Sequence, residues 1–144
     1  MNTVLDASVL AKFYVPEILS DRAEALLADA ARRQVDLNAP DLIYPEIGNV
    51  LWKKLRRGEL TGSDIGEIVQ SVCLLPLRIV PSKALLPLAV DIGARYGITV
   101  YDSIYVSAAQ VSRGELITAD RRLADTLAKT DLGKMVSWLG DYGN

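Results

Sequence analysis

The sequence predicts an α/β fold in which a short parallel sheet is covered by helices on both faces. Strand-length apolar runs alternate with helix-length stretches along the whole chain, and most of the strand-like runs are continuously apolar. Strands of a parallel sheet are buried on both faces, so they lack the polar side that alternation would produce. Neighbouring parallel strands also require a crossover, usually a helix. We therefore expect a three-layer α/β/α arrangement.

The first part of the chain supplies two strands and two helices. Residues 3–5 form a short apolar run that includes β-branched side chains, and the pattern becomes helical after Asp6. Residues 20–34 form an amphipathic helix whose acidic start and arginine-rich end match the helix dipole. Residues 35–40 follow as a strand that ends at a proline.

The middle of the chain continues the alternation. Residues 44–58 read as a helix because apolar residues recur at helical spacing and a glycine follows as a stop signal. A second helix is expected at residues 61–75 and a strand at residues 77–81. Residues 85–97 read as a helix with Pro87 in its first turn and a glycine as its C-cap.

The last part of the chain contains the least polar helix. Residues 101–114 carry no charge between the second residue and Arg113, so this helix should be buried on most sides. A strand at residues 115–120, a helix at residues 121–130 and a strand at residues 135–139 complete the expected elements.

The composition restricts the chemistry that is available to the chain. Its 144 residues suggest one domain spanning residues 1–144. The 16 basic and 18 acidic residues give a net charge of −2, so the chain is not a strongly basic nucleic-acid binder. There is no histidine, which excludes a Ser-His-Asp triad, paired-histidine acid–base chemistry and imidazole zinc sites. Carboxylates, hydroxyls, Lys, Arg or Tyr must therefore carry any catalysis.

The cysteine content and the hydropathy pattern indicate a cytoplasmic protein. The single cysteine, Cys73, lies in an apolar run and is expected to be a buried, inert thiol. A lone cysteine allows no intrachain disulfide, which fits a reducing compartment. The apolar runs are far shorter than the ~20 residues that cross a bilayer, and no signal peptide is recognisable.

Four acidic residues fall where an α/β protein places its ligand site. Ligands bind beyond the carboxyl ends of parallel strands. Asp6 and Asp120 follow expected strands, Asp102 begins the uncharged helix, and Glu46 lies in mid-helix beside apolar neighbours. Each aspartate also fits an N-cap, a structural role that leaves the function open. A helix cap does not explain Glu46, because a half-buried carboxylate needs a partner.

Carboxylates gathered at one edge would repel one another, and a hard divalent cation would resolve that repulsion. Mg²⁺ and Mn²⁺ prefer oxygen ligands and suit such a group. A salt bridge is the other available partner for Glu46. The spacing of the residues does not decide between the two.

Four segments, taken together and in order, resemble the PIN-domain family in its VapC-type toxin branch. They are VLDAS at 4–8, YPEIGNVLWK at 44–53, YDSIYVSAA at 101–109 and TADRRL at 118–123. The match runs from residue 4 to about residue 127. The resemblance implies a PIN-like α/β/α fold and endonucleolytic cleavage of single-stranded or structured RNA with Mg²⁺ or Mn²⁺. It also implies a toxin that forms a homodimer and is neutralised by a cognate antitoxin protein.

The resemblance also assigns roles to individual residues. The acidic positions, which would bind metal and serve catalysis, match Asp6, Glu46, Asp102 and Asp120. The neighbouring polar positions, which would orient ligands or water, match Ser8, Asn49 and Thr118. Arg122 stands where many PIN domains carry a further acid, which argues against a fully occupied second metal site.

Phosphate contacts require cations, and the chain offers several. The candidates are Lys12, Lys53, Lys54, Arg56, Arg57, Arg113, Arg121 and Arg122. We favour Arg121 as a supporting site residue, together with Arg122, because the two directly follow Asp120. Solvated helix charge is the alternative for all of them.

Other functional classes fit the pattern less well. A receiver domain needs an acidic pair near the first strand, an aspartate on a middle strand and a lysine after a late strand. A haloacid-dehalogenase-type phosphatase needs D-x-D after the first strand. The sequence has none of these features. A non-catalytic PIN-like scaffold that binds RNA or protein, with its aspartates acting only as caps, stays open as the alternative.

Overall fold

Five parallel strands form one sheet through the middle of the molecule. The computed structural model describes all 144 residues, Met1–Asn144. The strand order is β3-β2-β1-β4-β5, and all four pairings are parallel. The strands are β1 (Asn2–Leu5), β2 (Asp36–Pro40), β3 (Arg78–Val80), β4 (Glu115–Thr118) and β5 (Val136–Trp138). The predicted parallel α/β sheet is confirmed.

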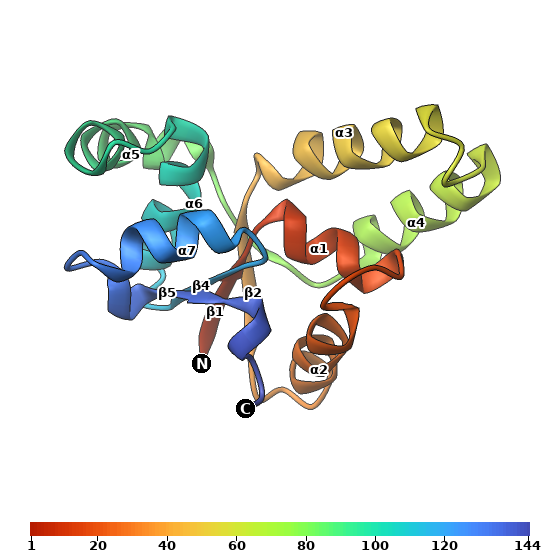
Figure 1. Ribbon diagram of the computed structural model, residues 1–144, viewed down its shortest axis with the longest axis horizontal. Coiled ribbons are helices and arrows are strands. Elements are labelled where there is room, and N and C mark those ends of the chain that lie inside the picture. Colours follow the sequence, from red (N-terminus) through yellow and green to blue (C-terminus); the bar gives the residue numbers. More distant parts are fainter.

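Seven α-helices cover the two faces of this sheet. They are α1 (Ala7–Tyr14), α2 (Ser20–Ala31), α3 (Ile43–Arg56), α4 (Gly62–Leu74), α5 (Ser82–Tyr96), α6 (Val100–Val111) and α7 (Arg121–Ala128). Figure 1 shows α1 to α4 on one side of the sheet and α5 to α7 on the other. None of these helices combines the length and the apolar character needed to cross a membrane.

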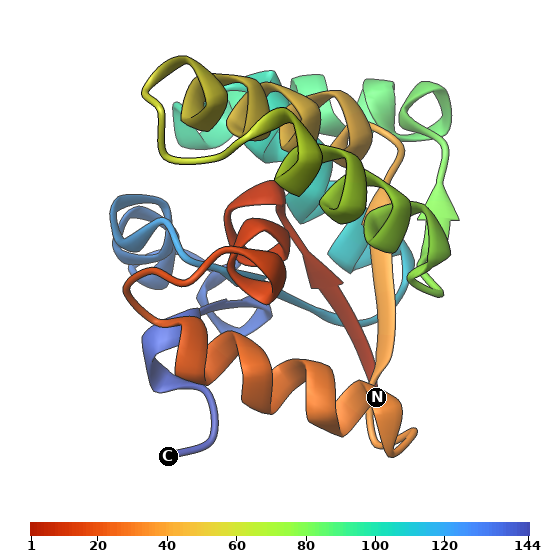
Figure 2. The same ribbon diagram turned by 90° about the vertical axis from the view of Figure 1, so that its right-hand side faces the viewer.

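The order of the strands creates a switch point between β1 and β4. From β1 the chain moves outward to β2 and β3, then returns across the sheet to β4 and β5. The helices change sides at this reversal, because crossovers between parallel strands are right-handed. In Figure 2, β1 (red) and β2 (orange) run upward toward α3 to α6, and α2 lies beneath. The carboxyl ends of the strands therefore face the helices that carry Glu46 and Asp102.

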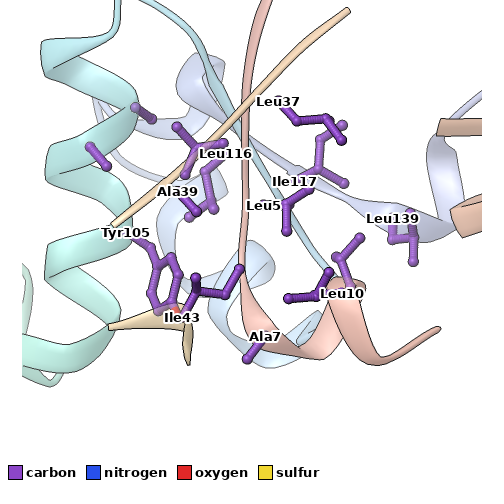
Figure 3. Packing of buried hydrophobic residues seen from close by; sticks show 14 of the residues in the cluster. Leu5, Ala7, Leu10, Leu37, Ala39, Ile43, Tyr105, Leu116, Ile117 and Leu139 are labelled. Carbon is purple, nitrogen blue, oxygen red and sulfur yellow. The ribbon is translucent and has the colours of Figure 1, made fainter. Parts of the chain in front are cut away.

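The core lies along β1, β4 and α6. Val4 and Leu5 of β1 and Leu116 of β4 are fully buried. Helix α6 packs on β1, β2 and β4, and α5 covers α6 from outside. Seven consecutive residues of α6, 103–109, are buried, which confirms the burial predicted from the lack of charge. Figure 3 shows Leu5, Leu116 and Tyr105 among the residues that fill this core.

Helix α5 differs from its predicted form. It begins at Ser82, so Pro87 lies inside the helix rather than in its first turn. The backbone N–H of Ser82 donates a 3.0 Å hydrogen bond to Asp41, and the Ser82 hydroxyl also donates to that carboxylate. Proline within a helix removes one intrahelical hydrogen bond. The anchored start and the buried face that includes Leu85 and Ala89 hold the helix together despite that loss.

The prediction for Cys73 was wrong, because its side chain is exposed. The buried residues of α4 are Ile68 and Val72. This helix packs against α3 at the outside of the molecule, so only one stripe of its surface is covered. Cys73, which directly follows Val72, falls on the uncovered side.

Candidate active site at the carboxyl edge of the sheet

Asp6 lies directly after β1, beside the end of β4. The register of the two strands sets Leu5 beside Ile117, which places Asp6 next to Thr118. The Thr118 hydroxyl donates a 2.5 Å hydrogen bond to Oδ2 of Asp6. The other oxygen, Oδ1, accepts from the Ser8 hydroxyl at 2.5 Å and from the Val9 backbone N–H at 3.1 Å. Asp6 caps α1 and is only 8% exposed.

Asp120 belongs to the same hydrogen-bond network. Its backbone N–H donates to the Thr118 hydroxyl at 3.0 Å, and the Ala119 N–H donates to the Ser8 hydroxyl at 3.2 Å. Its Oδ1 accepts from the Leu123 N–H at 3.1 Å, so Asp120 caps α7. Ser8 and Thr118 therefore tie the two capping aspartates together across the switch point.

Asp102 is not a helix cap. Thr99 caps α6, and its hydroxyl accepts from the Asp102 backbone N–H at 3.1 Å. Asp102 is the third residue of α6, in its first turn, and its carboxylate forms no ion pair. The capping explanation is therefore wrong for this residue, although it holds for Asp6 and Asp120.

Glu46 has a partner that the sequence did not reveal. It lies in the first turn of α3, not in mid-helix, and it is half-buried. The hydroxyl of Tyr105 on α6 donates a 2.9 Å hydrogen bond to its Oε2. Burial, followed by the negative charge of Glu46, raises the pKa of Tyr105, so the phenol remains a proton donor. One signal was present in the sequence: Tyr105 stands one helical turn after Asp102, in a helix that is otherwise almost entirely small or aliphatic.

The carboxylates share one electrostatic environment. Burial raises the pKa of Asp6, and the charge of Asp102 raises it further. The pKa of Glu46 is likewise raised by burial, and then by the charges of Asp6 and Asp102. Burial raises the pKa of Asp102, the Thr99 hydroxyl partly offsets this, and the charge of Asp120 adds to it. The charge of Asp102 thus acts on both Asp6 and Glu46, and its own pKa responds to the charge of Asp120.

No cation of the protein neutralises this cluster. The chain forms nine ion pairs, and none of them includes Asp6, Glu46, Asp102 or Asp120. Their hard oxygen donors and their uncompensated charge fit a Mg²⁺ or Mn²⁺ ion. However, no three acidic or cysteine side chains are close enough together to form a ready-made metal site. An ion bound here would have to draw the carboxylates together.

The remaining predicted site residues lie around this group. Asn49 lies one turn beyond Glu46 on α3, exposed, and its side chain makes no hydrogen bond within the chain. The Arg121 guanidinium stacks on the Trp138 ring at 4.2 Å and pairs with Asp125 at 3.1 Å. Arg122 lines a surface pocket of about 350 Å³ together with Asp102 and Asp120. Of the two arginines, Arg122 is therefore the one that lines the acidic pocket.

The family assignment follows from comparison with known proteins. The family model described as "PIN domain" matches residues 3–128, a span that contains all four acids. The chain belongs to the PIN-domain family. The resemblance found in its motifs is thereby confirmed.

The relatives of this PIN domain are VapC proteins. Ribonuclease VapC3 of Pyrobaculum aerophilum is 35% identical over 127 residues, covering 87% of this chain and 94% of the relative. The crystal structure of PAE2754, also from Pyrobaculum aerophilum, is 25% identical, with a TM-score of 0.67 over 97% of this chain and 93% of that one. A toxin-antitoxin complex from Klebsiella pneumoniae shares the fold at 16% identity, with a TM-score of 0.55 over 94% of this chain and 95% of that one.

Proposed function

We propose that the protein is a metal-dependent endoribonuclease that acts as the toxin of a toxin–antitoxin pair. The observation that carries the proposal is the group of carboxylates at the switch point, which repel one another and form no ion pair within the chain. The similarity to a VapC ribonuclease, with all four acids inside the matched family model, supports RNA as the substrate.

Asp6, Glu46, Asp102 and Asp120 would hold Mg²⁺ or Mn²⁺. When bound, a divalent ion acidifies water and stabilises negative charge on a phosphate. The hydrogen bonds from Ser8 and Thr118 fix the orientation of the Asp6 carboxylate. Glu46 has an oxygen, Oε1, that accepts no hydrogen bond in the chain, and this oxygen is available to a metal ion or to the attacking water.

Arg122 is the phosphate contact that the pocket favours. It is exposed, lines the same pocket as Asp102 and Asp120, and forms no ion pair. A guanidinium binds two phosphate oxygens at once, which suits the backbone of a nucleic acid. The substrate would enter with its phosphate between this arginine and the carboxylates.

The partners follow from the same assignment. We expect an antitoxin protein to bind the toxin, by analogy with the toxin-antitoxin complex that shares the fold. A homodimer is a further expectation. Exposed apolar side chains on the outer helices offer surface for such partners: Tyr44, Trp52 and Leu55 on α3, Val69 on α4, and Leu86 and Val90 on α5.

The non-catalytic scaffold explains less of the structure. A scaffold needs Asp6 and Asp120 only as caps, and both do cap helices. It gives no reason for Asp102 and Glu46, which cap nothing and raise the electrostatic energy of the folded chain.

Cleavage of a labelled single-stranded RNA tests the proposal. The purified protein and Asp102→Asn are compared in Mg²⁺, in Mn²⁺ and in EDTA. We expect cleavage that requires metal and falls at least a hundredfold in Asp102→Asn. Because Thr99 caps α6 through the backbone N–H of Asp102, the substitution removes a charge and leaves that capping bond in place. Equal cleavage by both proteins, or cleavage that persists in EDTA, would contradict the proposal.

A further inference from the structure

We propose that Tyr105 is a positioning residue, whose hydroxyl holds the Glu46 carboxylate in the orientation that receives the metal ion. The inference rests on the proposed function, since it concerns the same site. Tyr105 itself touches neither substrate nor metal in this proposal, and it acts only through Glu46.

The first argument is where the hydrogen bond runs. Glu46 and Tyr105 are 59 residues apart and belong to helices on opposite sides of the sheet. Their 2.9 Å bond crosses the carboxyl edge, where the strands end. It therefore connects the two halves of the acidic group, with Glu46 on α3 and Asp102 on α6.

The second argument is the rigidity of the donor. Tyr105 is 3% exposed, and the residues on either side of it along α6 are buried as well. Tyr105 belongs to the same buried cluster as Ile43, which is itself fully buried in the first turn of α3, and Figure 3 shows both among the core residues. A ring fixed by close packing presents its hydroxyl at one position. The hydroxyl can therefore select one arrangement of the flexible Glu46 side chain.

The third argument is that Glu46 has no other anchor. Its carboxylate accepts no backbone hydrogen bond and forms no ion pair, whereas Asp6 and Asp120 are fixed by capping bonds. The negative charges of Asp6 and Asp102 repel the Glu46 carboxylate. The Tyr105 bond opposes that repulsion, engaging Oε2 and leaving Oε1 for the ion.

The purely structural alternative is that the hydroxyl only needs a partner because it is buried. In that case Glu46 would satisfy Tyr105, and metal binding would not depend on the bond. The two explanations predict different metal affinities for a variant that lacks the Tyr105 hydroxyl. Tyr105→Phe keeps the ring and removes only the hydroxyl.

Calorimetric titration of the metal-free protein with Mn²⁺ distinguishes them. Partners that orient a metal ligand typically contribute about 10- to 100-fold to metal affinity, so we expect Tyr105→Phe to weaken Mn²⁺ binding by at least about tenfold. In a Glu46→Ala background the same substitution should have no further effect, because its target is gone. Thermal melts in EDTA check that each variant is folded.

Tyr142→Phe is the matched control. The Tyr142 hydroxyl donates a 2.7 Å hydrogen bond to the Asp29 carboxylate, remote from the acidic group. Its removal should leave Mn²⁺ affinity unchanged. An unchanged affinity in Tyr105→Phe, or an equal loss with and without Glu46, would overturn the inference while leaving the proposed function standing. If wild type binds no Mn²⁺, the proposed function falls and the inference falls with it.

Discussion

The hydroxyl of Thr118 donates a 2.5 Å hydrogen bond to the carboxylate of Asp6 and joins the ends of two adjacent parallel strands. The same hydroxyl accepts the backbone N–H of Asp120 at 3.0 Å. One fully buried side chain thus orients two of the four acids. Thr118 therefore links the first and the last of the four acids.

Thr118→Val should destabilise the metal-free protein at pH 7. The substitution keeps the shape but leaves a buried carboxylate oxygen and a backbone N–H without their partner, which costs about 1–3 kcal/mol. Chemical denaturation measures the change. Thr126→Val removes an exposed helical hydroxyl that bonds only to the Arg122 carbonyl, and it should cost less than about 0.5 kcal/mol. Equal losses of unfolding free energy in the two variants would show that the Thr118 hydrogen bonds stabilise the fold no more than the exposed Thr126 bond does.

Divalent metal should stabilise the folded chain against heat. Ligand at 100 times its dissociation constant stabilises a protein by about 2.7 kcal/mol, provided that it binds only the folded state. We expect Mn²⁺ to raise the melting temperature of wild type but to have little effect on Asp102→Asn.

In EDTA, Asp102→Asn should be the more stable of the two proteins, by about 0.5 kcal/mol, because one repelling charge is gone. A less stable Asp102→Asn in EDTA would argue against repulsion within the group.

The stability that Asp6, Glu46 and Asp102 contribute to the metal-free protein should fall as the pH rises from about 4. The pKa values of Asp6, Glu46 and Asp102 are raised in the folded state, chiefly by burial. The native protein therefore holds these protons to a higher pH than the unfolded chain does. The stability that they contribute is complete below the unfolded pKa values and is lost as the pH passes through the folded ones.

Urea unfolding between pH 4 and pH 8 in EDTA tests this dependence. The free energy of unfolding should fall less steeply with pH in Asp102→Asn. This variant lacks one carboxyl with a raised pKa, and it also removes the charge that helps to raise the pKa values of Asp6 and Glu46. A pH dependence that is identical in wild type and Asp102→Asn would contradict the predicted contribution of the acidic group.

Arg122→Ala should impair RNA binding more than Arg121→Ala. The Arg122 guanidinium lines the pocket beside Asp102 and Asp120, whereas that of Arg121 is stacked on Trp138 and paired with Asp125. We expect about a tenfold rise in the RNA dissociation constant for Arg122→Ala, since charge-assisted phosphate contacts are each about 1.5–3 kcal/mol. The salt dependence of binding should also become less steep for that variant. A larger loss of RNA affinity in Arg121→Ala than in Arg122→Ala would contradict the placement of RNA at the pocket that Arg122 lines.

The sequence was sufficient where the chemistry is local. Asp6 and Asp120 each stand between the end of a strand and the start of a helix, and both features are visible within a few residues. The start of α6 was also encoded locally, because Thr99 and Asp102 have the spacing of a capping threonine and the acid three residues later. Assigning the helix start to residue 101 concealed that Asp102 lies inside the helix, free of a capping role.

Features set by tertiary packing were beyond the sequence. The bond from Tyr105 to Glu46 requires two helices from different crossovers to meet at one edge, and the position of Tyr105 one turn after Asp102 does not indicate Glu46 as its partner. The exposure of Cys73 depends on α4 having only α3 as its main helical neighbour. Arg121 stacks on Trp138 of β5, whereas Arg122 lines the acidic pocket. This difference depends on the position of the last strand, which the sequence near the arginines does not show.

The return of the chain from β3 to β4 has a consequence for the order of assembly. The acids are distributed from residue 6 to residue 120, and they meet only when β4 has been inserted beside β1. Contacts so distant along the chain slow folding, because closing a long loop costs conformational entropy. A chain that ends before β4 would lack Asp120 and the strand that places Thr118 beside Asp6. The proposed metal site would therefore exist only after the sheet is complete.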